Sequence, residues 1–412
     1  MSLEPFIEFH RPSLGEEEID EVIAVLRSGW LTTGPRTAQF EQEFRQYVMS
    51  SHALAVNSCT AGLHLALSAL GIGPGDEVIT TPLTFCATVN SILHVGATPV
   101  LADVGADGNI DPQCVERRLT ARTRAILPVH IAGLPCDMGR IWETARLHNL
   151  FVVEDAAHAL GTQYDGKPIG AAHVAGCSDA VAYSFYATKN LTTGEGGMVT
   201  THNEELLEKM RILCLHGISK NAWNRYKKDG SWYYEVVACG FKYNLTDIQA
   251  AIGIHQLRRQ EEFIRQRTRY ARFYSEAFAD LKELEAPTES LAGRHCWHLY
   301  QLRLNLDKLA IDRAAFIAEL RRRGIGASVH FIPIPMHPAY QELARLPQNH
   351  CPAAIDLYHR LVSLPLYPAM TGEQVDYVAK SVREVACQNS RVGRVALSAS
   401  SERSLSQEPA EK

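Results

Sequence analysis

Between residues 53 and 201, short apolar segments alternate with segments whose apolar residues recur at helical spacing. The apolar segments are as long as β-strands and contain few polar interruptions, which is typical of strands buried on both faces. We expect strands at residues 53–56, 77–80, 99–102, 125–130, 151–154 and 180–185. Strands that alternate with helices form βαβ units, and such units build a largely parallel sheet covered by helices. The chain is therefore predicted to have an α/β fold.

Length and composition narrow the class of protein. The 412 residues can bury a large core, and they suggest two or three domains, or one large α/β domain with a satellite. A formal charge of −5 argues against a nucleic-acid-binding protein, and no apolar run approaches the roughly 20 residues of a membrane span. Residues 1–18 lack the basic and apolar regions of a signal peptide. The ten cysteines form no C-x-x-C pair, so we expect no metal, no disulfide framework and a cytoplasmic location.

Capping patterns and periodicity predict the remaining elements. Ser13 and Glu16 have the spacing of a capping box, and the helix that follows should end near residue 28, before a polar turn at residues 30–35. A second capping box begins at Thr371 and precedes another amphipathic helix. Further helices are expected at residues 61–70, 203–213, 248–278 and 313–323, strands at 297–306 and 327–331, and a long loop at 222–237.

This pattern divides the chain into three parts. Residues 1–265 should form the large α/β domain with the N-terminal helix, and residues 266–386 a small α+β domain. Residues 387–412 are rich in serine, arginine and glutamate, so we expect a disordered tail there.

Lys189 follows the apolar run at residues 180–185 and precedes a turn that contains Gly194, Gly196 and Gly197. It would therefore lie at the carboxyl end of a strand, where open α/β sheets bind their ligands. A partly desolvated lysine has a lowered pKa, and its amine can attack a carbonyl group to form a Schiff base. The alternative interpretation is a solvated lysine on a loop, which is the common situation of this residue type.

Asp155 directly follows another expected strand, at residues 151–154. A carboxylate at that position is costly unless it faces a cationic partner. The protonated nitrogen of a pyridine ring is such a partner, and pyridoxal phosphate requires an aspartate there because the protonated ring acts as its electron sink. Asp155 and Lys189 together match the two ends of this one cofactor.

Other residues have both a functional and a structural interpretation. The start of the helix after residue 56 could bind a phosphate through its amides and the hydroxyl of Ser58 or Thr60, or these hydroxyls could only cap the helix. Phe85 could stack on a ligand or belong to the core. For Asn244 and His330 the residues alone favour a structural interpretation, as a helix cap or turn residue and as a structural histidine.

Taken together, these segments resemble the DegT/DnrJ/StrS sugar aminotransferases, which are fold type I pyridoxal-phosphate enzymes. The resemblance runs from about residue 9 to about residue 385, and its motifs occur in the order of the family. The motifs lie at residues 28–35, 57–62, 81–85, 154–159, 184–197, 240–247, 329–331 and 363–368. The resemblance implies an aspartate aminotransferase-like fold, with a large, mostly parallel sheet domain and a small α+β C-terminal domain.

The resemblance also implies roles for individual residues. Lys189 would hold the cofactor covalently, and Asp155 would pair with its ring nitrogen. The other expected cofactor contacts are His158 at the phenolic oxygen, Phe85 stacked on the ring, Thr60, Ala61 and Ser184 at the phosphate, and Asn244 from the partner subunit of a homodimer. The expected substrate contacts are Gly34, Tyr186 and His330. Tyr186 stands where several relatives carry histidine.

Glutamate would donate the amine and leave as 2-oxoglutarate, and a keto group on a nucleotide-linked sugar would accept it. The motifs look closest to enzymes that make UDP-4-amino-4-deoxy-L-arabinose or UDP-linked 4-amino-4,6-dideoxyhexoses. Two alternatives are a dehydratase and a non-catalytic regulator that binds the cofactor. Related dehydratases carry histidine in place of the lysine, and others bind an iron–sulfur cluster through grouped cysteines; this chain has neither feature.

Overall fold

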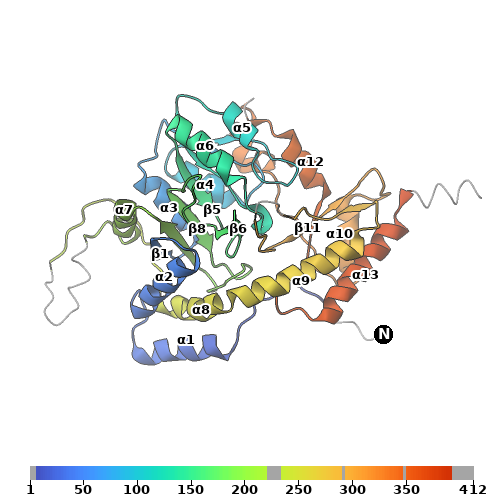
Figure 1. Ribbon diagram of the computed structural model, residues 1–412, viewed down its shortest axis with the longest axis horizontal. Helices are drawn as coiled ribbons and strands as arrows, with labels where there is room; N and C mark the ends of the chain where they lie inside the picture. The colour runs from blue at the N-terminus through green and yellow to red at the C-terminus, as the bar shows by residue number, and fades with distance from the viewer. Residues whose placement is uncertain (1–5, 220–232, 290–292, 347–348, 392–412) are drawn as a thin grey trace, which may run out of the picture.

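The computed structural model describes residues 6–219, 233–289, 293–346 and 349–391 (Figure 1). Its main sheet has seven strands in the order β1-β9-β8-β5-β4-β2-β3. The strands are β1 (His52–Val56), β2 (Glu77–Thr80), β3 (Thr98–Leu101), β4 (Thr123–Leu127), β5 (Phe151–Asp155), β8 (Ala180–Ser184) and β9 (Gly197–Thr201). Neighbours from β8 to β3 pair in parallel, and β9 is antiparallel to both β1 and β8. The predicted α/β fold with a mostly parallel sheet is confirmed.

All six strands expected in this region are present, and β9 is an additional strand that the sequence analysis did not predict. β9 follows directly on the glycine-rich turn, and two of its five residues are threonines, so it lacks the apolar run of the other strands. Every residue of β9 is nevertheless buried between β1 and β8.

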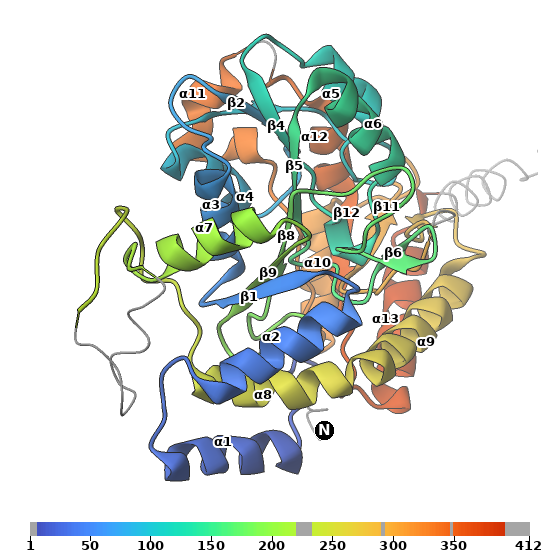
Figure 2. The same cartoon turned by 60° about the vertical axis from the view of Figure 1, so that its left-hand side comes forward.

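Helices cover both faces of the sheet (Figures 1 and 2). On one face, α3 (Cys59–Ala69), α4 (Cys86–His94) and α7 (Glu204–Cys214) share an apolar core with the strands. On the other face lie α2 (Pro35–Tyr47), α6 (Met138–His148) and α8 (Asp247–Arg258). Because each face buries apolar side chains, the strands have hydrophobic residues at consecutive positions rather than at alternating ones.

Helix α1 (Glu16–Ser28) forms where it was expected, but its start differs from the prediction. The N-cap is Gly15 rather than Ser13, and the Gly15 N–H donates to Glu18 Oε2 at 2.8 Å. Glu18 is held in this position because Gln256 of α8 also donates to it, at 2.7 Å. Helix α2 begins directly after the turn at residues 30–34 and was not predicted. Its buried Phe40 packs against Phe185, with ring centroids 5.3 Å apart.

The single helix expected to end at residue 278 is two helices, α8 and α9 (Gln260–Phe278), which meet at Arg259. The expected domain boundary at residue 265 lies inside α9. Ile264 packs against Gly161 of the large sheet domain, while Tyr274 and Phe278 belong to the C-terminal core. Helix α9 therefore joins the two parts of the molecule, as Figure 1 shows.

The C-terminal part contains a three-stranded antiparallel sheet of β10 (Leu284–Glu285), β11 (Tyr300–Leu304) and β12 (Leu361–Leu364). Helices α10 (Arg313–Arg322) and α13 (Gly372–Gln388) pack on it. The strand expected at residues 327–331 is wrong: this segment makes a single bridge, between Ser328 and Ser363 of β12. Two prolines, Pro333 and Pro335, follow soon after it, and proline cannot donate to a strand ladder.

The capping box at Thr371 is confirmed at the start of α13, which continues past the expected end of the domain at residue 386. Most of the expected tail and most of the expected loop at 222–237 lie outside the described residues.

The remaining elements are short: α5 (Pro112–Arg117), β6 (Gln163–Tyr164), β7 (Lys167–Pro168), α11 (Gln341–Ala344), α12 (Pro352–Arg360), and the 3-10 turns Ile131–Gly133, Ile334–Met336 and Pro338–Tyr340. Among the helices of the described ranges, none is long and apolar enough to span a membrane.

Candidate active site

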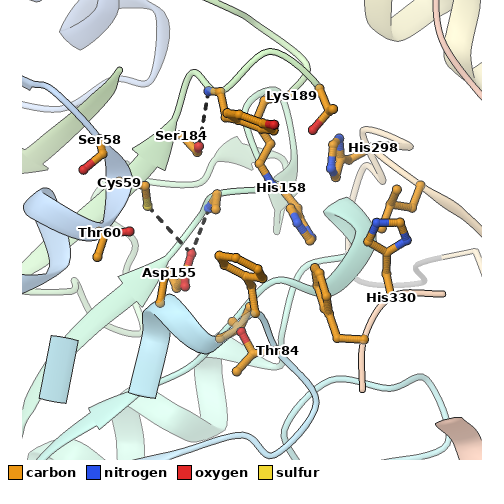
Figure 3. Close-up of a pocket in the computed structure, with 18 of the residues that line it drawn as sticks. Ser58, Cys59, Thr60, Thr84, Asp155, His158, Ser184, Lys189, His298 and His330 are labelled. Carbon is orange, nitrogen blue, oxygen red and sulfur yellow. Dashed lines mark hydrogen bonds between the residues drawn. The ribbon is translucent and has the colours of Figure 1, made fainter. Parts of the chain in front are cut away.

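A cavity of about 600 Å³ opens at the carboxyl ends of β5 and β8, between the large sheet and the C-terminal part (Figure 3). Strand ends of this kind form the usual ligand sites of open α/β sheets. The cavity brings together most of the expected site residues: Thr60, Phe85, Asp155, His158, Ser184, Tyr186, Lys189 and His330. Residues far apart in the chain therefore meet where the sequence predicted a site.

Asp155 is the last residue of β5, and its side chain is buried. It accepts hydrogen bonds from Thr88 Oγ1 at 2.8 Å and from the Ala157 N–H at 3.1 Å, and Cys59 Sγ lies 3.9 Å away. Burial raises the pKa of this carboxyl, whereas the hydrogen bonds from Thr88 and Ala157 act in the opposite direction. Within the part of the chain that the structure describes, no arginine or lysine forms an ion pair with it. A bound cation would therefore stabilise the carboxylate.

Lys189 lies in the turn after β8, and its N–H donates to the Tyr186 carbonyl at 2.9 Å. Burial lowers the pKa of the Lys189 amine to about 8, although the nearby Asp155 carboxylate acts in the opposite direction. No hydrogen bond of Nζ to another described residue is present. An amine with this pKa is partly neutral near physiological pH, which is the form that attacks a carbonyl carbon.

The N-terminus of α3 forms a candidate anion site at one end of the cavity. Ser58 is the N-cap, and its hydroxyl accepts from the Ala61 N–H at 3.1 Å. Thr60 and Ser184 line the cavity, but Ala61 does not. Gly197 of β9 permits this arrangement, because a Cβ there would lie 2.7 Å from the Cys59 nitrogen. Free amides at the start of a helix suit a phosphate group.

Phe85 precedes α4, and 59% of its surface is exposed, toward the cavity. A phenyl ring in this position offers a flat face on which an aromatic ring could stack. Phe331 lies near it, with ring centroids 6.0 Å apart. The Phe85 side chain is thus available to a ligand rather than part of the core.

His158 is buried and lies between two other rings, stacked on Phe331 at 5.6 Å and tilted toward His298 at 4.3 Å. Its Nδ1 accepts from the Ala132 N–H at 3.3 Å. A neutral imidazole that accepts at Nδ1 carries its proton on Nε2. Burial lowers the pKa of His158 well below its ordinary value, so the ring is a neutral Nε2–H donor.

Two further predicted residues line the cavity, His330 from the C-terminal part and Tyr186 from the turn after β8. His330 Nδ1 is 2.9 Å from the Ser363 hydroxyl, and burial lowers the pKa of this histidine to about 4. Tyr186 is half-exposed and lines the same cavity. Both side chains can reach a substrate, and neither carries a positive charge at neutral pH.

Gly34 and Asn244 do not join this cluster. They line a second cavity of about 240 Å³, beside α2 and α7. The Gly34 N–H donates to Asp247 Oδ1 at 2.8 Å, and Asn244 Nδ2 donates to Thr33 Oγ1 at 2.6 Å. Within a single chain these two residues do not contact the cavity that contains Lys189.

Several residues of the main cavity were not anticipated from the sequence: His10, Cys59, Thr84, Glu195, His298 and Phe331. His298 lies in the segment predicted as a strand at residues 297–306, where no sequence signal marked it as part of a site. Across the described ranges, no group of three or more histidine, cysteine, aspartate or glutamate residues could hold a metal ion.

The arrangement fits pyridoxal phosphate on three independent points. The buried carboxylate of Asp155 has no ion-pair partner among the described residues, the Lys189 amine has a lowered pKa, and the helix α3 terminus provides amides for a phosphate. All three face one cavity, so a single molecule could contact them at once.

Comparison with known proteins identifies the class. Residues 12–383 match the DegT/DnrJ/EryC1/StrS aminotransferase family, and the chain belongs to that family. Its cofactor is pyridoxal phosphate, as in structural neighbours solved in their PLP and PMP forms.

Three relatives illustrate the likeness. The spore coat polysaccharide biosynthesis protein SpsC of Bacillus subtilis is 50% identical over 382 residues, which cover 92% of this chain and 97% of SpsC. The PLP form of the putative sugar aminotransferase Spr1654 from Streptococcus pneumoniae superposes with a TM-score of 0.85 at 34% identity, covering 93% of this chain and 99% of Spr1654. Helicobacter pylori PseC, an aminotransferase involved in the biosynthesis of pseudoaminic acid, superposes with a TM-score of 0.85 at 32% identity. The match covers 93% of this chain and 100% of PseC.

Proposed function

We propose that the protein transfers the amino group of glutamate to the C4 keto group of a nucleotide-linked sugar, in the biosynthesis of a cell-surface polysaccharide. The observation that carries the proposal is the placement of the Lys189 amine and the Asp155 carboxylate in one cavity that also meets the N-terminus of α3. Pyridoxal phosphate, when bound, supplies the electron sink that stabilises negative charge on the carbon next to the transferred nitrogen.

Each residue of the cavity has a separate role in this proposal. Asp155 would keep the ring nitrogen protonated, Phe85 would stack on the ring, and His158 would donate its Nε2–H to the phenolic oxygen. Thr60 and Ser184 would hold the phosphate, together with the amides at the start of α3. Lys189 would anchor the cofactor through Nζ, and its amine, when free, would act as general base and acid at the reacting carbon.

The relatives support the class of substrate. SpsC is described by its part in making a spore coat polysaccharide, and PseC by its part in making pseudoaminic acid. A cavity of about 600 Å³ has the size of a typical small-molecule site. Tyr186 and His330 in its lining supply an aromatic surface and hydrogen-bonding groups for a sugar.

We further propose a homodimer in which Asn244 and Gly34 complete the site of the other subunit. Both lie away from Lys189 of their own chain, in the second cavity. The lining of the main cavity contains Lys189 but no arginine among the described residues, so the negative charges of a nucleotide need groups from elsewhere. Lys242, which donates to Asn244, would bring such a charge into the partner's site.

The alternatives fit less well. A related dehydratase would carry histidine in place of Lys189. The lowered pKa of the Lys189 amine, about 8, suits proton transfer, which a non-catalytic regulator does not perform. The location of the proposed sugar aminotransferase would be the cytoplasm, where nucleotide-linked sugars are made and consumed.

The test is a substrate panel. The protein is first converted with glutamate to the amine-bearing form of its cofactor and freed of excess amino acid. Nucleotide-linked 4-keto sugars are then added one at a time, and the return of the aldehyde form is followed by absorbance. We expect 2-oxoglutarate and at least one keto sugar to cause the return. A return with 2-oxoglutarate alone, and with none of the sugars, would contradict the proposed acceptor.

A further inference from the structure

His298 is a buried residue of the cavity to which neither the sequence motifs nor the reaction scheme above gives a role. It lies just before β11, only 6% of its surface is exposed, and it contributes to the cavity wall. Its ring is 4.3 Å from the ring of His158, between centroids, and Figure 3 shows it on the Lys189 side of His158. A polar ring this deeply buried should use both of its nitrogens.

The neighbouring residue Asn190 determines which nitrogen of His298 carries the proton. Asn190 Nδ2 faces three acceptors: the carbonyls of Leu160 and Cys296, each at 3.5 Å, and the sulfur of Cys296 at 3.1 Å. The opposite orientation of the amide would place its oxygen against those carbonyl oxygens. The Asn190 oxygen therefore points at His298 Nδ1, 3.1 Å away, and accepts a hydrogen bond from it.

With its proton on Nδ1, the ring of His298 has an unprotonated Nε2. No described residue donates a hydrogen bond to this atom, and it is not sealed inside the protein, because His298 lines the cavity. Burial lowers the pKa of His298 well below its ordinary value, and the nearby His158 acts in the same direction, so the ring stays neutral. Nε2 is thus an acceptor held in place at the wall of the cavity.

The position of His298 limits which part of a ligand can reach it. The reacting carbon must lie within reach of Lys189 Nζ. The His298 ring contacts the His158 ring, and it is close enough to Lys189 for the charge of that amine to lower the pKa of His298 (Figure 3). A group that meets Nε2 is therefore attached at, or directly beside, the reacting carbon. In a 4-keto pyranose, C5 carries the ring oxygen, which cannot donate, and C3 carries a hydroxyl, which can.

We propose that His298 Nε2, fixed by Asn190, accepts a hydrogen bond from the hydroxyl beside the reacting carbon of the acceptor substrate. This inference rests on the proposed function, under which the hydroxyl is the one at C3 of the 4-keto sugar. His298 would then select substrates: a site built to bind a hydroxyl strongly disfavours an analogue that lacks it, since its own polar group stays unpaired.

Two substitutions separate this role from a structural one. The amide of glutamine places an oxygen near the position of Nε2, and the amide of asparagine places its polar atoms near Nδ1. In His298→Gln the contact with the substrate is kept and the contact with Asn190 is lost, while His298→Asn does the reverse. We expect kcat/KM for a 4-keto sugar, relative to the rate of the glutamate half-reaction, to fall about 10- to 100-fold in His298→Asn. In His298→Gln the same relative kcat/KM should fall by less than about threefold.

A matched pair of substrates completes the test. The wild-type protein should prefer the sugar with a C3 hydroxyl over its 3-deoxy analogue by about 10- to 100-fold. This preference should persist in His298→Gln and disappear in His298→Asn. The reverse order of the two variants would show that His298 only anchors Asn190, and an unchanged preference in both, or an equal loss in both, would also overturn the proposal.

A spectroscopic measurement distinguishes failure of this proposal from failure of the proposed function. Nitrogen-15 NMR of histidine-labelled protein, with His298→Gln as the assignment control, reports the tautomer without any substrate. We expect Nδ1–H, with Nε2 shifting when the keto sugar is added. The Nε2–H tautomer would overturn the role of His298 alone, whereas a wild-type protein that aminates no sugar of the panel would overturn the proposed function and, with it, this inference.

Discussion

At the scale of single residues, Lys189 is subject to two opposing effects. Burial disfavours its charged form, and the Asp155 carboxylate favours it, yet the pKa still falls to about 8. We predict that Lys189→Ala abolishes covalent binding of the cofactor and turnover, because no second lysine of the described residues lines the cavity within its own chain. Lys209→Ala, which removes an exposed lysine paired with Glu205 on α7, is the matched control and should keep both. Absorbance and mass spectrometry measure the covalent complex; full turnover in Lys189→Ala would refute the assignment.

The lowered pKa of Lys189 also predicts a pH dependence. Only the neutral amine attacks the aldehyde, and its fraction grows as pH rises toward the pKa. The rate at which cofactor-free protein binds pyridoxal phosphate covalently should therefore rise with pH and level off above about 8. An exposed lysine would keep gaining rate up to about 10.4. Stopped-flow absorbance across this range decides between the two, and a rate that still climbs beyond pH 10 would show that the amine is not perturbed.

Asp155 has neutral donors around it and no ion-pair partner among the described residues. We predict that Asp155→Asn lowers affinity for the cofactor by about 1.5–3 kcal/mol, because a neutral amide cannot hold the pyridinium proton. The half-reaction with glutamate should slow at the same time, with little change in the melting temperature. Equal glutamate rates in the variant and the wild type would rule out this role.

At the scale of elements, the N-terminus of α3 is expected to combine stability with binding. Ser58→Ala removes the cap on the Ala61 amide and should cost about 1 kcal/mol of folding free energy. Asn203→Ala removes the cap of α7, where the Asn203 side chain accepts from the Leu206 N–H, and should cost a similar amount. Only Ser58→Ala should weaken binding of pyridoxal phosphate more than binding of pyridoxal. Equal effects of the two variants on cofactor affinity would place the phosphate elsewhere.

Elements with a strong local signal were predictable from the sequence. The six apolar strands and the capping box at Thr371 are present as predicted. Burial of a strand on both faces and capping of a helix each depend on residues that are adjacent in the sequence. Strand β9 and helix α2 were missed, since β9 is buried only through its neighbours and α2 has few apolar residues beyond Phe40 and Phe44. The strand expected at residues 327–331 failed for a different reason. The local pattern favoured a strand, but the segment makes a single bridge to β12, which pairs with β11, and Pro333 and Pro335 follow soon after.

The residues of the candidate site also divide into those that a local sequence pattern predicts and those that only tertiary packing places. Lys189 and Asp155 could be proposed from the sequence because Asp155 ends one apolar strand, Lys189 lies in the turn after another, and strand ends of one sheet lie together. His298 and Phe331 come from the C-terminal part, and only the packing of that part against the large sheet brings them to the cavity. The free Nε2 of His298 depends on the orientation of Asn190, which no sequence pattern encodes.

At the scale of the whole molecule, the proposed homodimer can be tested by complementation. Lys189→Ala and an inactive variant such as Asn244→Leu are mixed under conditions that exchange subunits, and a tagged pull-down confirms the heterodimers. If Asn244 serves the partner's site, one site of each heterodimer has both lesions and the other has neither, so half of the sites should work. If the subunits exchange slowly, the mixture is mildly denatured and refolded. Each protein treated alone in the same way is the control. Confirmed heterodimers without recovered activity would show that Asn244 acts only in its own chain.

The most direct test of the account follows the nitrogen itself. The protein is incubated with glutamate labelled with nitrogen-15 and with the 4-keto nucleotide sugar that the panel selects, and the sugar product is analysed by mass spectrometry. We expect the labelled nitrogen at C4 of the sugar, one equivalent of 2-oxoglutarate for each amine transferred, and no transfer by Lys189→Ala. A sugar that is consumed without gaining the label, or that gains it equally with the Lys189→Ala protein, would contradict the assignment of this chain as a sugar aminotransferase that acts through Lys189.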